Sequence, residues 1–146
     1  MDGEDVSTAI RTVEVTENAS APARIAKVRT FLVDYQRKIS ESKSVVMDGR
    51  DIGTVVLPRA ELKIYLDASV ECRARRRMLE REQSGIFKSL EDTMNEITTR
   101  DFKDSTRKIS PLKCAEDAIV VDSSKMSIDE VVNKIIFYVN ERGLIK

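Results

Sequence analysis

Three short, mainly apolar runs, separated by segments with helical periodicity, constrain the fold of this chain more than any other feature. The runs are residues 44–47, 62–66 and 118–121, and an aspartate directly follows each of them. Short apolar runs are typical of buried strands, and strands that alternate with helices pair in parallel, with helices packed on the sheet faces. The sequence therefore predicts an α/β fold built on a parallel sheet.

The segments between and beside these runs show the signals of helices. From residue 23 to about 42, apolar residues recur at helical intervals, so we expect a helix with one buried face. Ser69 is a suitable N-cap for a helix that ends near Gln83. Residues 1–22 are polar, and we expect them to form part of a small irregular subdomain.

Two further helices are indicated by their first turns. Ser89 and Asp92 resemble a capping box, in which two side chains satisfy free backbone N–H groups. Ser127 and Glu130 form the same signal before a continuous apolar stripe that ends ahead of Gly143. This last helix is the clearest of the four.

The composition excludes several kinds of chemistry. The 146 residues contain no histidine, and the two cysteines lack the spacing of metal ligands, so any catalysis would depend on Arg, Lys and Asp. Because 25 basic residues balance 25 acidic ones, a general affinity for nucleic acid or an anionic membrane is not expected. No apolar segment is long enough for a membrane span or a secretory signal, and we expect a cytoplasmic protein.

The turn after the first apolar run, Asp48-Gly49-Arg50-Asp51, is the first candidate site. Ligands of open α/β sheets collect at the carboxyl ends of strands, where Arg50 could bind a phosphate and Asp51 could accept from an amino group. An ordinary polar turn accounts for the residues about as well.

A second candidate is the segment from Arg100 to Arg107. On a helix, Arg100, Asp104 and Arg107 lie within roughly 60° of one another, so two guanidiniums flank one carboxylate. This arrangement suits a clamp for a sugar and a phosphate, although a solvated ladder of ion pairs would have the same spacing. If the clamp forms, Arg50 and Asp51 should lie in the same cleft.

The third candidate is the cluster of arginines 73, 75, 76 and 77, shortly before a Ser-Gly turn at residues 84–85. Crowded like charges repel, and an anionic ligand would relieve that repulsion. A mobile lid in a phosphoryl-transfer enzyme uses arginines in this way. An exposed basic helix is the plain alternative.

Taken in order, these segments carry a family resemblance over nearly the whole chain. The matching residues are Gly3 to Val6, Ile10 to Thr12, Asn18 to Ser20, Val28-Arg29, Asp48 to Val56, Leu62 to Ser69, Arg75 to Arg77, Arg100-Asp101, Asp104, Arg107, Pro111-Leu112 and Asp117-Ala118. The ordered set resembles bacterial cytidylate kinase, one of the nucleoside monophosphate kinases.

The resemblance implies ATP-dependent phosphoryl transfer to CMP or dCMP, with Mg²⁺ bridging the nucleotide phosphates. It also implies a phosphate-loop NTPase-like parallel sheet with flanking helices. Residues 1–43 would be part of the CMP-binding insertion and a connecting helix. Residues 44–146 would be the core, with a lid at about 72–90.

The resemblance also implies roles for individual residues. Ser20, Arg29 and Asp51 would contact the cytosine base. The two arginines Arg50 and Arg107 would hold the acceptor phosphate, and Arg100 and Asp104 would contact the sugar region. The arginines Arg76 and Arg77 would belong to the lid and face ATP, with Arg76 acting in catalysis beside Arg50 and Arg107.

The departures from the family pattern are also informative. The chain contains no Gly-x-x-x-x-Gly-Lys-Ser/Thr, the loop that cradles ATP phosphates, and Lys103 stands where an arginine is usual. The resemblance implies that the chain begins inside the CMP-binding insertion, so that the first strand and this loop are absent. Two alternatives to a complete enzyme follow: a non-catalytic CMP-binding module, or a subunit that completes a split kinase with a front fragment or a second copy.

Overall fold

A computed structural model describes residues 3–18, 25–83 and 85–145 of the chain. The chain divides into two compact units, Met1–Val46 and Met47–Lys146, and each is described by itself.

The first unit is helical in its described part. It contains the short 3₁₀ helix η1 (Ala9–Arg11), the helix α1 (Val13–Asn18) and the longer helix α2 (Ala26–Ser42). The structure confirms the helix expected from the periodicity of residues 23–42. The expectation of a buried face on it is wrong, because no residue of α2 is buried and Phe31 is 68% exposed.

The first apolar run does not form the expected strand. Residues 44–47 have no regular secondary structure, and the side chain of Val46 is fully exposed. A strand is stable only when a neighbour pairs with its backbone N–H and C=O groups, and neither described strand pairs with this run. The apolar character of residues 44–47 was therefore not enough to make them a strand.

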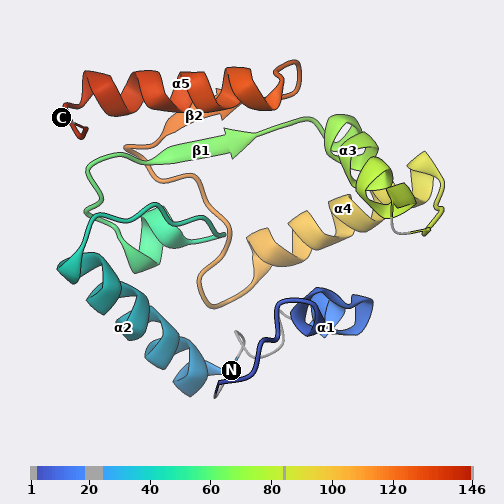
Figure 1. The fold of residues 1–146 in the computed structure, drawn as a ribbon, viewed down its shortest axis with the longest axis horizontal. Helices are drawn as coiled ribbons and strands as arrows, with labels where there is room; N and C mark the ends of the chain where they lie inside the picture. Colours follow the sequence, from blue (N-terminus) through green and yellow to red (C-terminus); the bar gives the residue numbers. More distant parts are fainter. Residues whose placement is uncertain (1–2, 19–24, 84, 146) are drawn as a thin grey trace. The chain divides into compact units, whose positions relative to one another are not determined.

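The second unit has the expected α/β character (Figure 1). Its elements in order are η3 (Ile52–Val56), β1 (Ile64–Asp67), α3 (Val70–Gln83), α4 (Leu90–Thr106), β2 (Ile119–Asp122) and α5 (Ile128–Glu141). The strands β1 and β2 pair in parallel, with Ile64 opposite Ile119 and Asp67 opposite Asp122. The sheet is thus parallel as predicted, but it has two strands in the described residues rather than three.

The helix ends follow the sequence signals closely. The Ser69 hydroxyl accepts from the Cys72 N–H at 3.2 Å, and α3 ends at Gln83. Ser127 and Glu130 form the complete capping box of α5. At α4 only half of the box forms: the Ser89 hydroxyl accepts from the Asp92 N–H, and the Asp92 carboxylate accepts from that hydroxyl.

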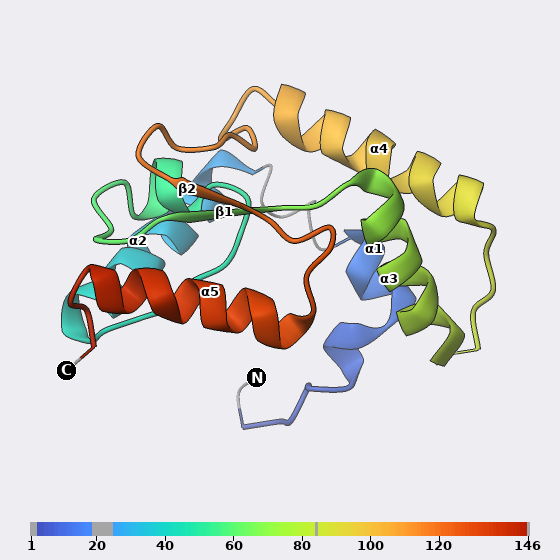
Figure 2. The same ribbon diagram turned by 90° about the horizontal axis from the view of Figure 1, so that it is seen from above.

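The helices α3 and α4 pack against each other and hold much of the buried interior of the second unit. Ala74 of α3 is completely buried, as is Thr93 of α4, and Ile97 is 6% exposed. Figure 2 shows α4 and α5 on opposite sides of the two strands. None of the described helices has the length and hydrophobicity needed to span a lipid bilayer.

Candidate functional site

The segment after Met47 forms a tightly bonded loop that presents Asp51. The Asp51 carbonyl accepts from the N–H groups of Val55 and Val56, at 2.8 and 3.2 Å, and so starts the π-helical turn η3. A side chain at Gly49 would lie 2.9 Å from the Ile52 side chain, so only glycine fits there without a shift. Val56, the last residue of the turn, is buried, and the Asp51 side chain is only 10% exposed.

The carboxylate of Asp104 is the centre of a cluster of charges. It lies in the last turn of α4 with only 16% of its side chain exposed, and it accepts from Arg50 Nε at 2.9 Å. Arg100 Nε lies 4.0 Å from the same oxygen, and Arg107 Nη1 lies 4.0 Å from the other oxygen. Three guanidiniums therefore surround one carboxylate.

Arg107 connects this cluster to the Asp51 loop. It directly follows α4 as the C-cap residue, with extended backbone rather than helical backbone. Its Nε donates to the Ser110 carbonyl, where Ser110 has a φ of +50° that is uncommon for a residue other than glycine. Its Nη2 lies 4.0 Å from Asp51 Oδ1, so one arginine faces the carboxylates of both Asp51 and Asp104.

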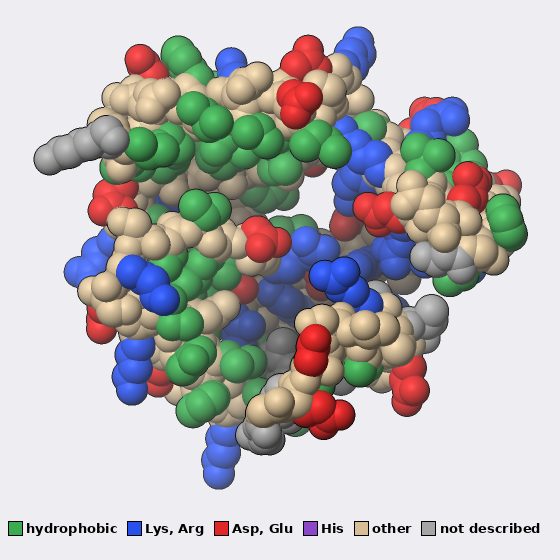
Figure 3. All heavy atoms as spheres, viewed as in Figure 1, with side chains coloured by type: hydrophobic (Ala, Val, Ile, Leu, Met, Phe, Trp, Pro, Cys, Tyr) green, Lys and Arg blue, Asp and Glu red, His purple; other side chains and the backbone are tan. Residues whose placement is uncertain are grey.

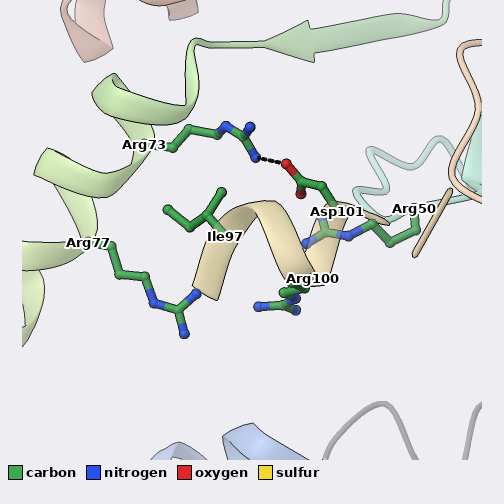
Figure 4. A pocket seen from close by; sticks show the side chains of 6 residues that line it. All are labelled: Arg50, Arg73, Arg77, Ile97, Arg100 and Asp101. Atoms are coloured by element: carbon green, nitrogen blue, oxygen red, sulfur yellow. Dashed lines mark hydrogen bonds and ion pairs between the residues drawn. The ribbon is translucent and has the colours of Figure 1, made fainter. Parts of the chain in front are cut away.

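A pocket of about 170 Å³ opens beside this cluster, between α3 and α4. Figure 4 shows the side chains that line it: Arg73 and Arg77 from α3, Ile97, Arg100 and Asp101 from α4, and Arg50 from the loop. Arg73 Nη1 donates to Asp101 Oδ2 at 2.7 Å across the pocket. Arg50 and Arg100 thus belong both to the pocket lining and to the ring around Asp104.

Arg76 lies elsewhere in the second unit. Its guanidinium donates to the Ser123 carbonyl at 2.6 Å, to the Ser123 hydroxyl at 3.1 Å and to the Met126 carbonyl at 3.4 Å. Ser123 is itself buried and donates to the Asp67 carbonyl. In this arrangement Arg76 fastens α3 to the turn that follows β2.

Of the residues expected at the site, the structure brings five together: Arg50, Asp51, Arg100, Asp104 and Arg107. Arg77 lines the adjoining pocket, and Arg76 does not. Arg29 lies on α2 in the first unit, and Ser20 falls outside the described residues.

The sequence analysis placed Arg73 in the third candidate cluster without giving it a role of its own, and it did not single out Asp101, although both line the pocket. A spacing signal exists for Arg73. Arg73 and Arg77 are four residues apart on one helix and so share a face, whereas Arg76 is turned about 100° away from Arg77. Asp101 could be recognised only once its contact across α3 and α4 was known.

The described residues contain no group of three or more Cys, Asp or Glu side chains that could hold a metal ion. The site is instead cationic, and its carboxylates are already engaged by arginines. Guanidiniums gathered in this way have the chemistry to bind oxyanions, such as phosphate esters.

Comparison with known proteins gives the family. Residues 1–141 match the family described as Cytidylate kinase. The chain is 57% identical over 143 residues to the cytidylate kinase of Desulforamulus reducens, which covers 98% of the chain and 64% of that relative. It is 52% identical over 135 residues to the cytidylate kinase of Lactobacillus gasseri, covering 92% of the chain and 59% of the relative. The chain belongs to the cytidylate kinase family.

The match with a third relative, the cytidylate kinase of Leuconostoc mesenteroides, has the same extent. It is 54% identical over 131 residues, which cover 90% of this chain and 58% of that relative. The chain therefore spans about three fifths of the length of the curated relatives it matches.

Proposed function

We propose that this chain binds CMP or dCMP at the cluster around Asp104, and that this site serves ATP-dependent phosphoryl transfer giving CDP or dCDP. The observation that carries the proposal is one shielded carboxylate surrounded by Arg50, Arg100 and Arg107, with Asp51 next to Arg107. Membership in the cytidylate kinase family supports the choice of nucleotide.

Each group in the cluster has a chemistry suited to one part of the nucleotide. The planar guanidiniums of Arg50 and Arg107 can bind the acceptor phosphate through two parallel hydrogen bonds each. Asp104 can accept from sugar hydroxyls, with Arg100 beside it. Asp51 can accept from the exocyclic amine of cytosine, a group that uracil lacks, and Arg29 and Ser20 would donate to the base.

The phosphate donor in this proposal is ATP, with Mg²⁺ bridging the nucleotide phosphates, as the family implies. Arg77 and Arg76 remain the proposed contacts to ATP, and Arg77 lies in the pocket beside Arg100. The 146 residues contain no Gly-x-x-x-x-Gly-Lys-Ser/Thr loop. Since that loop positions the transferred phosphate, we propose that these residues bind CMP but do not turn it over alone.

This absence favours a second candidate function, in which the chain is a CMP-binding module or one subunit of a split kinase. The two functions share the monophosphate site and differ in whether another polypeptide supplies the ATP cradle. A turnover assay separates them.

The monophosphate site is tested by calorimetric titration of CMP into the purified chain and into Asp51→Ala. Without the acceptor, the amino group of the bound base lacks a partner, so affinity should fall about tenfold to a hundredfold. Asp48→Ala is the matched control, because it removes an exposed carboxylate from the same turn and should leave affinity unchanged. Equal affinities of the chain and Asp51→Ala would refute the assignment of Asp51.

Turnover is tested by measuring ADP formation from ATP and CMP. The purified chain should show no appreciable CMP-dependent activity. Addition of a fragment that carries the phosphate-binding loop of a cytidylate kinase should produce activity, and Arg107→Gln in the chain should abolish it. Robust activity of the chain alone would contradict the proposal that these residues lack an ATP cradle.

A further inference from the structure

The pocket between α3 and α4 carries an unbalanced charge. Four arginines line it, Arg50, Arg73, Arg77 and Arg100, against a single carboxylate, Asp101. Two of the four, Arg50 and Arg100, also face Asp104. Gathering guanidiniums around one small volume costs electrostatic free energy unless an anion enters it. The lining therefore indicates a ligand with several negative oxygens.

Arg77 is the cation most available to such a ligand. Within the described part of the chain, its guanidinium forms no hydrogen bond or ion pair at contact distance, and Glu80 and Glu96 act on it only as more distant charges. Burial, together with the nearby positive charges of Arg81 and Arg100, lowers the pKa of Arg77. Burial and the neighbouring arginines therefore disfavour the positive charge of Arg77, which an anionic ligand would stabilise.

Arg73 is held differently, because two bonds fix its guanidinium at the pocket. Its Nε donates to the Ala68 carbonyl at 3.0 Å, where the chain leaves β1, and its Nη1 donates to Asp101 at 2.7 Å. Both side chains of this ion pair are 34% exposed, so a ligand in the pocket can reach them. Figure 4 shows the Arg73 side chain from α3 and the Asp101 side chain from α4 meeting near Ile97.

Phosphate binding at these arginines rests on the proposed function. We propose further that Asp101 is a built-in competitor, which occupies Arg73 until a phosphate-type dianion displaces it. A phosphate offers more acceptor oxygens and a higher charge than a carboxylate, so it can engage Arg73 and Arg77 together. Asp101 stabilises the empty pocket by neutralising one of its cations. It also lowers the affinity for the anion, because binding must first break the Arg73–Asp101 pair.

This inference deepens the proposed function, because Arg50 and Arg100 are shared with the cluster around Asp104. A competitor of this kind keeps a strongly cationic pocket from retaining phosphate after a phosphoryl group has left. It therefore favours exchange of ligands over tight retention. The inference requires no base recognition, so it can be tested without CMP.

The test is a titration of inorganic phosphate into the purified chain, followed by NMR of the arginine Nε–H resonances. Arg77→Gln should weaken phosphate binding about tenfold, since a charge-assisted contact is lost. Asp101→Asn keeps the shape but removes the competing charge, and should tighten binding roughly threefold to tenfold.

The ion pair between Arg75 and Glu71 supplies matched controls. Both residues lie on the exposed surface of α3 and outside the pocket lining. Arg75→Gln changes the net charge as Arg77→Gln does, and Glu71→Gln changes it as Asp101→Asn does. Each control should alter phosphate affinity by less than about twofold, because exposed distant charges are screened. Equal effects of Arg77→Gln and Arg75→Gln would overturn the pocket assignment.

Two results isolate the role of Asp101. In an Arg73→Gln background, Asp101→Asn should no longer tighten binding, because the competition acts through Arg73. If Asp101→Asn instead weakens phosphate binding, Asp101 positions Arg73 and the proposed competition is wrong. The unmodified chain gives an independent measurement in case a variant fails to fold. Phosphate should shift the Arg73 and Arg77 Nε–H resonances at one common midpoint, and an unmoved Arg73 resonance would also overturn the proposal.

Failure of this inference and failure of the proposed function are distinguishable. Loss of CMP binding in Asp51→Ala with no phosphate response at Arg73 would leave the monophosphate site standing and remove only the pocket. A phosphate response at Arg73 and Arg77 in a chain that does not bind CMP would support the pocket and remove the monophosphate site.

Discussion

The helix pair α3–α4 and the helix α5 belong to the same unit, but the faces of these helices are buried to very different extents. α3 and α4 bury Ala74, Thr93 and Ile97 between or beneath them. α5 has no buried residue, although Ile128, Val132, Ile136 and Phe137 are apolar and lie along it. Figure 3 shows hydrophobic side chains gathered in a band along α5.

The difference shows that amphipathicity predicts which face of a helix is buried only if the covering partner is present. α3 and α4 cover each other, and ion pairs such as Arg73–Asp101 and Arg81–Glu96 join them. The described strands beside α5 are only two, too few to bury a helix face of this size.

The largest expected effect contrasts one isoleucine from each region. Ile97→Ala removes a buried side chain between α3 and α4 and should lower the free energy of unfolding by about 2–4 kcal/mol. Ile136→Ala makes the same chemical change on α5, where the side chain is 44% exposed, and should cost less than about 1 kcal/mol. Urea unfolding of the two variants measures both values. Equal losses would show that the α5 stripe is covered in solution.

A medium effect separates helix formation from helix burial. The Ser127 hydroxyl and the Glu130 carboxylate each bond a backbone N–H at the start of α5. Ser127→Ala should therefore lower the free energy of unfolding by about 1 kcal/mol even though the face of α5 is uncovered. Circular dichroism during urea unfolding measures this loss of stability. Ser105→Ala is the control, because it removes an exposed hydroxyl near the C-terminal end of another helix, α4. No loss of stability would mean that α5 does not need its cap.

The sequence predicted correctly those features of the fold that depend on contacts between residues close together in the chain. The caps at Ser69 and Ser127 were predicted correctly because each hydroxyl accepts from a backbone N–H only three residues further along the chain. The strand at residues 44–47 was predicted wrongly, because a strand also needs a neighbour that pairs with its backbone, and neither described strand pairs with this run. The same reasoning explains the uncovered face of α2.

The candidate site divides in the same way. The helix spacing predicted that Arg100 and Arg107 would flank Asp104, and the structure places them there. The contacts that cross between elements, Arg50 to Asp104 and Arg73 to Asp101, link residues 54 and 28 positions apart. No local pattern reports such contacts. The role of Arg76 remains a prediction, although its present bonds are to the turn after β2.

The smallest expected effect lies at the tip of the α3–α4 pair, where Glu96 accepts from both Arg81 and Lys88. The hydrogen bond from Lys88, with a further contribution from Arg81, lowers the pKa of Glu96, against the opposing effect of partial burial. Because the group is about one third exposed, Glu96→Gln should cost only about 0.2–1 kcal/mol at neutral pH.

The pH dependence gives this small effect a sign that can be checked. A carboxyl whose pKa is lower in the folded chain than in the unfolded chain stabilises the fold above its unfolded pKa, and that contribution is lost as the pH falls through the folded pKa. The stability difference between the chain and Glu96→Gln should therefore be constant near neutrality and shrink in acid. A difference that grew toward low pH would mean that the ion pairs at Glu96 do not hold α3 and α4 together, and that packing at Ile97 alone joins them.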